Sequence, residues 1–231
     1  MTPKQQKPVV LFDLDGTLID TTDLILSCFH HCWEKVCGIT HDRAALLQTF
    51  GMPLSDAMCR LVDAAKQLHP DPRNDHETSH LVERLVSEYR AFNLANHDTL
   101  AQPFGQMREA LVELRRRDYS LGVVTSKGRD LAVRGLNLCS LGDLFDTAVF
   151  LEDTNRHKPD PAPILEALSR LNASSLSAAY VGDSAHDIIA GRRAGVHTIA
   201  ALWGPGCRDD LEQAMPDRLA SSIGELLEIF T

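Results

Sequence analysis

The stretch VVLFDLDGTL, residues 9–18, joins a short apolar segment to two closely spaced carboxylates. Four consecutive apolar residues, 9–12, are typical of a strand that is buried on both faces in a parallel sheet. Asp13 and Asp15 follow at the carboxyl end of that strand, where open α/β sheets bind ligands. If the strand continues, the two carboxylates point the same way and repel, so a divalent cation or a shared proton must hold them. The alternative is a simple turn, because Asp-Gly is common turn chemistry.

The chain after residue 100 alternates strand-like and helix-like segments. Aliphatic segments bounded by Gly, Asp, Thr or Ser predict strands at 121–125, 147–151, 178–182 and 197–202. Apolar residues at helical spacing predict helices at 105–118, 128–138, 161–171, 186–194 and 222–230. This alternation predicts an α/β fold with a doubly wound, Rossmann-like parallel sheet.

Residues 20–98 interrupt the alternation, because nothing in them predicts a strand. Apolar spacing predicts helices at 23–37, 54–68 and 78–94, and the segment PDPRN, residues 70–74, separates the last two. Such an interval is far too long for a crossover of one helix. We therefore predict a catalytic core of residues 1–17 and 98–231, with an inserted α-helical cap domain of residues 18–97. The hinges are expected near 17–22 and 96–103.

Composition narrows the class of protein. The chain has 231 residues, enough to bury a substantial core, and a formal net charge of −9. A general nucleic-acid binder needs clustered Lys and Arg, so no nucleic-acid partner is expected. No segment approaches the roughly 18 apolar residues that cross a membrane, and no signal-peptide hydrophobic region precedes the first strand. The six cysteines form no CxxC and no disulfide-like framework, which is typical of a cytoplasmic protein.

Four motifs follow one another in an order that is typical of one enzyme family, each beside a predicted strand. They are FDLDGTL (12–18), VVTSK (123–127), HKPDP (157–161) and GDSAHD (182–187). On these motifs the chain resembles the haloacid dehalogenase superfamily of phosphatases, in the branch that includes phosphoglycolate phosphatases and pyrophosphatases. The resemblance runs over nearly the whole chain, and it leaves little room for the simple-turn interpretation of residues 13–16.

The resemblance implies four catalytic residues. Asp13 would attack phosphorus and form an aspartyl-phosphate, while Asp15 would protonate the leaving oxygen and later activate water. Thr125 would hydrogen-bond a phosphoryl oxygen, the alternative being a helix N-cap. Lys158 would neutralise the negative charge of the transferring group, with Lys127 as a rival phosphate contact.

The same resemblance implies substrate contacts around this centre. Gly16 would let the backbone approach the phosphoryl group closely, and Ser126 would offer its backbone N–H. In the predicted cap, the stretch TFGMPLSD at 49–56 resembles the caps of phosphoglycolate phosphatases and pyrophosphatases. We therefore expect Gly51 and Pro53 to close over Asp13.

A magnesium site is implied by oxygen ligands beside a phosphate. Asp13, the backbone carbonyl of Asp15, and Asp183 would bind Mg²⁺ directly, whereas Asp187 would act through a water or through Ser184. His186 lies inside the fourth motif, but its neighbours account for the site without it.

These observations predict a Mg²⁺-dependent phosphatase for a small phosphorylated metabolite, such as phosphoglycolate, or for pyrophosphate. A dehalogenase is not expected, because its halide leaving group needs no acid such as Asp15. A sugar phosphomutase of the β-phosphoglucomutase type is an alternative, although no Arg stands beside Gly51. A non-catalytic regulatory protein on the same fold is a second alternative. The oligomeric state stays open between a monomer and a homodimer.

Overall fold

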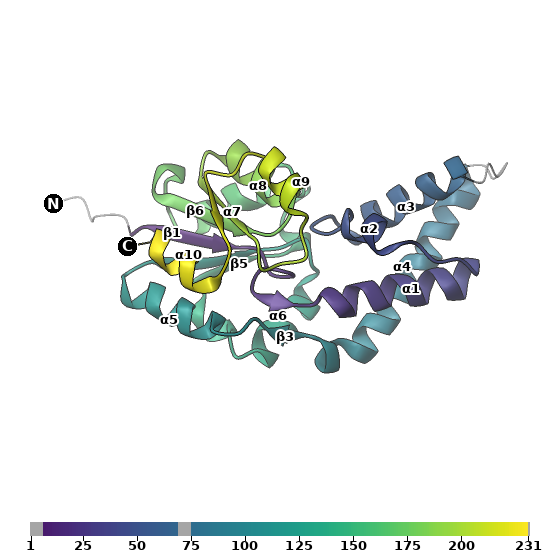
Figure 1. The fold of residues 1–231 in the computed structure, drawn as a ribbon, viewed down its shortest axis with the longest axis horizontal. Coiled ribbons are helices and arrows are strands. Elements are labelled where there is room, and N and C mark those ends of the chain that lie inside the picture. The colour runs from purple at the N-terminus through teal and green to yellow at the C-terminus, as the bar shows by residue number, and fades with distance from the viewer. Residues whose placement is uncertain (1–6, 69–74, 231) are drawn as a thin grey trace.

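A six-stranded sheet forms the centre of one half of the molecule in the computed structural model, which describes residues 7–68 and 75–230 (Figure 1). All its pairings are parallel, in the order β5-β4-β1-β6-β7-β8. The strands are β1 (Val9–Phe12), β4 (Ser120–Val124), β5 (Thr147–Val149), β6 (Ala178–Gly182), β7 (His197–Ala201) and β8 (Arg218–Ala220). The predicted fold class is confirmed, with β1 at the centre between β4 and β6.

Helices cover both faces of the sheet, which explains why β1 is apolar throughout. Val10 and Phe12 pack with residues of α5 (Met107–Arg116) and α10 (Ile223–Ile229). Val9 and Leu11 face the opposite side and pack with α7 (Ala162–Arg170) and α8 (Ala185–Ala194). Successive side chains of a strand alternate between faces, so a strand between two helical layers needs apolar residues at every position.

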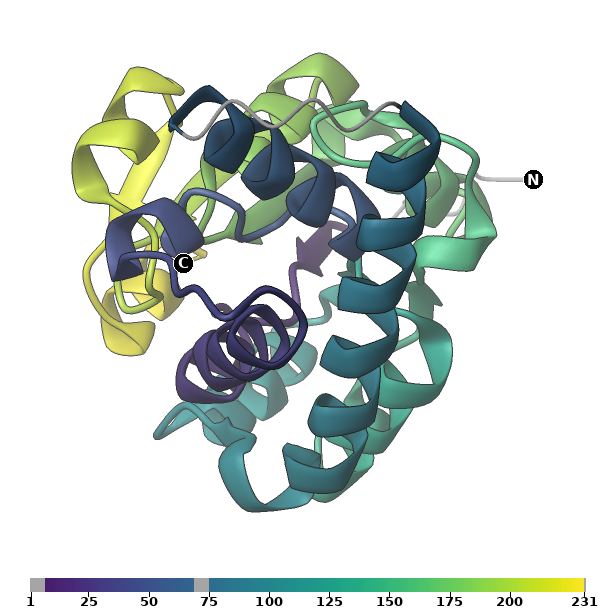
Figure 2. The ribbon, with the colours of Figure 1, turned by 90° about the vertical axis from the view of Figure 1, so that its right-hand side faces the viewer.

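The chain between β1 and β4 forms four helices that lie to one side of the sheet (Figures 1 and 2). We call them the cap helices: α1 (Thr22–Cys37), α2 (Arg43–Leu47), α3 (Leu54–Leu68) and α4 (Asp75–Leu100). The most extensive contact is between α1 and α4, where the rings of Phe29 and Tyr89 meet edge to face at 5.1 Å. The predicted break at 70–74 lies outside the described residues.

A two-stranded antiparallel ribbon joins the cap helices to the sheet. It pairs β2 (Ile19–Asp20) with β3 (Gln102–Pro103), within the two segments predicted as hinges. The apolar core does not stop at this ribbon, because buried Leu18, Ile19 and Leu24 belong to the same cluster as Phe12. The limits of a separate domain at 18 and 97 therefore stay a prediction.

Several elements differ from the sequence prediction. Strand β8, α2 and α9 (Arg208–Gln213) were not expected, and α4 runs well beyond the predicted 78–94 at both ends. β8 is an edge strand of three residues, with Arg218 exposed and Leu219 half-buried, so it lacks the apolar signature of the inner strands. β5 is shorter than predicted because a 3₁₀ turn, Leu151–Asp153, replaces its end. Among the described helices, none is long and apolar enough to cross a membrane.

Candidate active site

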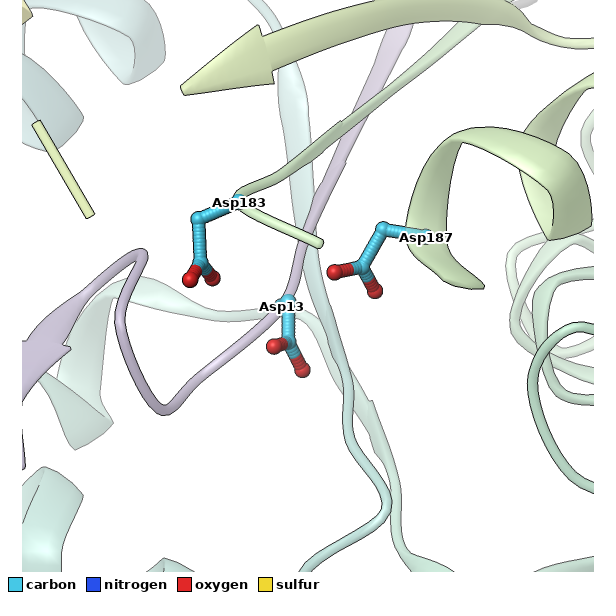
Figure 3. A group of neighbouring side chains, drawn as sticks. All are labelled: Asp13, Asp183 and Asp187. Atoms are coloured by element: carbon cyan, nitrogen blue, oxygen red, sulfur yellow. The ribbon is translucent and has the colours of Figure 1, made fainter. Parts of the chain in front are cut away.

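Three buried carboxylates converge at the carboxyl ends of β1 and β6 (Figure 3). Asp13 follows β1, Asp183 follows β6, and Asp187 lies in the first turn of α8. One carboxylate oxygen of each lies within 4.8 Å of the others. Adjacent strands of a parallel sheet end at the same edge, so residues 170 positions apart along the chain meet here as the sequence predicted.

Lys158 is the cation that lies among these carboxylates. It is 3% exposed, and its Nζ lies 2.7 Å from Oδ1 of Asp13 and 2.7 Å from Oδ1 of Asp187. Burial alone would lower the pKa of Lys158, but the two carboxylates outweigh it and raise that pKa. The predicted proximity of Lys158 to Asp13 is therefore present, through a direct ion pair.

One ammonium group does not balance three buried carboxylates. Burial raises the pKa of Asp13 to about 7, against the opposing effect of Lys158. The pKa of Asp183 is also raised well above its ordinary value, first by burial and then by Asp187 and Asp13. Buried charge of one sign is costly without a partner, so this centre favours an additional cation.

Asp183 is fixed by the turn that follows Asp13. Oγ1 of Thr17 donates to Oδ1 of Asp183 at 2.8 Å. Gly16 has a φ of +84°, and a Cβ at this position would lie 2.4 Å from Oδ2 of Asp183. The close approach to Asp183 therefore requires a glycine here, and the expected approach of the Gly16 backbone to a phosphoryl group stays a prediction.

Both carboxylate oxygens of Asp187 have partners. Oδ1 accepts from Lys158 and lies 2.9 Å from the hydroxyl of Tyr180, and Oδ2 accepts from the backbone N–H of Ser184 at 3.1 Å. Ser184 and Asp187 also form the capping box of α8. These contacts suit a residue that holds Lys158, and the expectation that Asp187 acts on a metal through a water or through Ser184 stays a prediction.

Asp15 lies beside the three carboxylates but has its own partners. Its Oδ1 accepts from Nζ of Lys127 at 2.7 Å and from Oγ1 of Thr21 at 2.8 Å. Thr21 precedes the first cap helix, and Lys127 follows β4. Lys127, expected as a rival phosphate contact, is here the partner of the candidate acid/base.

Thr125 and Ser126 lie at the end of β4. Oγ1 of Thr125 accepts from the backbone N–H of Lys127 at 3.1 Å, and Gly128 is the N-cap of α6 (Arg129–Leu138). The alternative of Thr125 as a helix N-cap is therefore wrong. The hydroxyl of Ser126 donates to the carbonyl oxygen of Gly51 at 2.9 Å, which ties the sheet edge to the loop between α2 and α3.

Gly51 comes into close contact with the fourth motif. It has a φ of +81°, and a Cβ there would lie 2.5 Å from Oγ of Ser184 and 3.7 Å from Cβ of His186. The expected position of this loop near the sheet edge is therefore present. Pro53 is buried but does not line the cavity described below, whereas its neighbours Met52 and Leu54 do.

A cavity of about 510 Å³ lies between the sheet edge and the cap helices. Six residues predicted from the sequence line it: Asp13, Asp15, Gly51, Thr125, Ser126 and Lys158. Gly16, Pro53, Asp183 and Asp187 are not among the lining residues. The cavity thus offers a ligand the carboxylate of Asp13, the hydroxyl of Thr125 and the ammonium group of Lys158.

Comparison with known proteins settles the family. The sequence model of the haloacid dehalogenase-like hydrolases matches residues 10–201. The chain belongs to this family. It is 37% identical to pyrophosphatase PpaX of Bacillus velezensis, over 95% of the chain and 94% of the relative. The PpaX of Halalkalibacterium halodurans is 36% identical, over 95% of each chain. The predicted family and class of enzyme, a hydrolase acting on phosphate esters, are confirmed.

Solved structures show the same fold over the full length. A predicted phosphoglycolate phosphatase of Haemophilus somnus 129pt superposes with a TM-score of 0.82 at 23% identity, over 99% of this chain and 100% of that one. A haloacid dehalogenase-like family protein of Streptococcus pneumoniae gives 0.81 at 24%, over 98% and 99%. The family's fold therefore includes the cap helices of this chain.

Sequence reasoning missed residues of the site that no family motif contains. Tyr180 lies in the middle of β6, and its hydroxyl contacts both Lys158 and Asp187; a lone phenol in an apolar strand was the available signal. The remaining wall of the cavity comes from α1, the loop between α2 and α3, the start of α3, α4, α6 and the 3₁₀ turn after β5. It includes Phe29, Tyr89, Arg90, Asn93 and Arg134. Helical periodicity predicts that such residues share a face, but not that the face borders a cavity.

Proposed function

We propose that this hydrolase is a Mg²⁺-dependent phosphatase that acts on a small phosphorylated compound through an aspartyl-phosphate on Asp13. The observation that carries the proposal is the ion pair of Asp13 with buried Lys158 at the floor of the cavity. A carboxylate and an ammonium group side by side can attack phosphorus and balance its charge, respectively. Pyrophosphate and phosphoglycolate are the candidate substrates that we test first, because one relative is named a pyrophosphatase and one structural neighbour a predicted phosphoglycolate phosphatase.

The donor set fits Mg²⁺. Asp13 and Asp183 offer carboxylate oxygens at adjacent strand ends, and a cation bound there would offset the negative charge that Lys158 leaves unbalanced. We assign Mg²⁺ to Asp13, Asp183 and the backbone carbonyl of Asp15, with Asp187 in an indirect role through Lys158. When bound, the metal would draw charge from the phosphoryl oxygens and orient the phosphate against Asp13.

The residues of the chain then divide the reaction into two displacements. A carboxylate oxygen of Asp13 attacks phosphorus in line, and the bond from phosphorus to the leaving oxygen breaks. Asp15, protonated, gives its proton to that oxygen; it then takes a proton from the water that attacks the aspartyl-phosphate. Thr125 donates its hydroxyl to a phosphoryl oxygen, and Lys158 balances the charge near Asp13.

Asp15 must change partners to act as an acid. As it stands, its Oδ1 accepts from Nζ of Lys127 and from Oγ1 of Thr21. Thr21 lies in the segment that joins β2 to α1, so a movement of the cap helices would alter this contact directly. We infer that substrate binding rearranges this hinge and frees Asp15 for proton transfer.

The mutase alternative keeps one observation in its favour. The sequence offers no Arg beside Gly51, but Arg90 of α4 and Arg134 of α6 both line the cavity and could bind a second phosphate. A mutase transfers the phosphoryl group back to sugar, whereas a phosphatase releases inorganic phosphate. The regulatory alternative predicts neither product.

Metal removal tests the proposal. Hydrolysis of 4-nitrophenyl phosphate should require Mg²⁺, disappear in EDTA and be inhibited by Ca²⁺, whose looser coordination misplaces nucleophile and phosphorus. Asp183→Ala should raise the Mg²⁺ concentration needed for half-maximal rate more than Asp187→Ala does. Full activity in EDTA contradicts the metal assignment, and the absence of turnover on every phosphate tested contradicts the phosphatase. A location in the cytoplasm and a monomeric or homodimeric state remain predictions.

A further inference from the structure

Lys158 has an acceptor for each of the three N–H groups of its ammonium. Two acceptors are carboxylate oxygens of Asp13 and Asp187, each 2.7 Å from Nζ, and the third is the hydroxyl oxygen of Tyr180, at 3.2 Å. A lysine side chain is flexible and its ammonium group rotates, so two contacts alone would leave it free to turn about the line between its acceptors. The third contact removes that freedom and fixes where Nζ lies relative to Asp13.

Tyr180 is itself held firmly in place. It is fully buried in the middle of β6, and its ring lies beside Gly191 of α8, where an added Cβ would be 3.5 Å from Cδ1 of the ring. Its hydroxyl lies 2.9 Å from Oδ1 of Asp187 and 3.1 Å from the carbonyl oxygen of Val124. A phenol has one proton, so the hydroxyl donates to one of these two acceptors while its oxygen accepts from Lys158.

This hydroxyl connects the elements that carry the reacting groups. Strand β1 lies between β4 and β6, and Tyr180 reaches across it to Val124, the residue before Thr125. Its other two contacts are to Lys158 and to Asp187 of α8. Tyr180 is not among the described residues that line the cavity, so its effect on a substrate must pass through the groups that it holds.

We propose that Tyr180 is a positioning residue for the phosphatase reaction. Its hydroxyl holds the ammonium group of Lys158 against Asp13, where that charge balances the transferring phosphoryl group without having to move first. Without the hydroxyl the ammonium group shifts, and the first displacement slows although the substrate still binds. This inference rests on the proposed function, because it takes Asp13 as the nucleophile.

The first experiment compares wild type with Tyr180→Phe in single turnovers of 4-nitrophenyl phosphate, with Mg²⁺ and excess enzyme. Phenylalanine keeps the ring, whose centroid lies 5.9 Å from Nζ of Lys158, and removes only the hydroxyl. We expect the maximal rate of nitrophenolate release to fall about tenfold, or ~1.4 kcal/mol in the barrier, while the half-saturating concentration changes by less than about twofold. A maximal rate within about twofold of wild type overturns the inference, and so does a loss carried by the half-saturating concentration.

Thr198→Val is the matched control for the loss of a buried hydroxyl. Thr198 is fully buried and pairs with Tyr180 in the sheet, and its hydroxyl donates to Oδ2 of Asp217 at 2.9 Å. It lies outside the described lining of the cavity. The variant should lower the urea midpoint and keep the wild-type rate. An equal loss of rate in both variants would show that damage to the sheet slows the reaction, and would overturn the role of Tyr180.

A further pair of variants tests whether Tyr180 acts through Lys158. If it does, removal of the hydroxyl changes nothing once the ammonium group is gone. Lys158→Met and Lys158→Met/Tyr180→Phe should therefore have the same residual rate. A further fall of about tenfold in the double variant overturns the assignment to Lys158. Where the residual rate is too low to measure, the comparison with Thr198→Val decides.

The two proposals fail in different ways. If hydrolysis requires Asp13 and Mg²⁺ while Tyr180→Phe behaves like Thr198→Val, the proposed function holds and only the role of Tyr180 is wrong. If Asp13→Asn keeps the wild-type rate, or the wild type hydrolyses no phosphate tested, the proposed function itself fails, and the inference fails with it.

Discussion

At the sheet edge the charged side chains pair with one another, whereas on the side of the cap helices the wall of the cavity is mostly apolar. Asp13, Lys158 and Asp187 form a connected set of ion pairs. Asn93, by contrast, lies buried in the cavity wall, and its Oδ1 has no hydrogen-bond partner among the described residues. We propose that the first region performs the reaction on the phosphate and that the second selects what the phosphate is attached to. Substitutions in the two regions should therefore change different kinetic constants.

The largest effect is expected at the nucleophile. Asp13→Asn keeps the shape of the side chain but removes the attacking charge, so kcat should fall by several orders of magnitude while the fold survives. The measurement is steady-state hydrolysis of 4-nitrophenyl phosphate, with circular dichroism as a control for folding. Retention of more than about a tenth of the wild-type kcat, a barrier change below ~1.4 kcal/mol, contradicts the covalent mechanism.

Removal of Lys158 should affect both activity and stability. Lys158→Met leaves Asp13 and Asp187 buried without their cation, which costs on the order of 3–5 kcal/mol in the free energy of unfolding. Lys127→Met is the comparison. The ion pair of Lys127 with Asp15 is more exposed to solvent, since 12% of the Lys127 side chain and 20% of the Asp15 side chain are accessible. It should lose less stability. Urea unfolding of both variants measures the difference in the free energy of unfolding. Equal losses would show that the burial of the Lys158 ion pairs does not determine the cost of removing them.

Substitution of Gly51 should act on the substrate side. Gly51 has a positive φ, and a valine side chain there would clash with Ser184. The loop must therefore shift in Gly51→Val. We expect KM to rise about tenfold and the order of substrates to change, because the loop borders the cavity; Met52→Arg should shift the preference as well.

Gly38→Ala is the matched control for Gly51. Gly38 also has a positive φ, +68°, but a Cβ there meets nothing within 4 Å. The backbone cost of roughly 1 kcal/mol should lower stability without changing KM. Unchanged selectivity in Gly51→Val and Met52→Arg would show that this loop does not select substrates.

The smallest effect is expected at the exposed ion pair that joins the cap helix α4 to α6. Asp98 of α4 accepts from Arg134 of α6 at 2.8 Å through both oxygens, and Arg134 and then His97 lower its pKa from 3.8 to about 2. A lowered pKa in the folded state stabilises it above the ordinary pKa, and the contribution is lost as pH falls toward 2. Asp98→Asn should lower the urea midpoint slightly at pH 7, with the difference from wild type shrinking below about pH 4. A constant difference across this range contradicts the ion pair as its cause.

The sequence predicted the sheet edge better than the cap side for a physical reason. Strands β1 and β6 were predicted with their exact limits, because they are buried on both faces and therefore continuously apolar. The residues that follow them meet because parallel strands end together. Contacts that cross between elements, such as Lys127 to Asp15 and Gly16 to Asp183, depend on turns whose geometry spacing does not fix. The same holds for Asn93, which periodicity places on the buried face of a helix without showing that this face meets a cavity.

The central claim, a phosphoryl group carried by Asp13, is tested most directly by a pre-steady-state experiment on Asp15→Asn. The 4-nitrophenolate leaving group needs no proton, so the first displacement should proceed, while the second lacks the base that activates water. We predict a burst of nitrophenolate approaching one equivalent per enzyme, with the phosphoryl group recovered by mass spectrometry on the peptide that contains Asp13. A burst of the same size in the Asp13→Asn/Asp15→Asn variant, or a phosphoryl group on any other residue, would contradict the account.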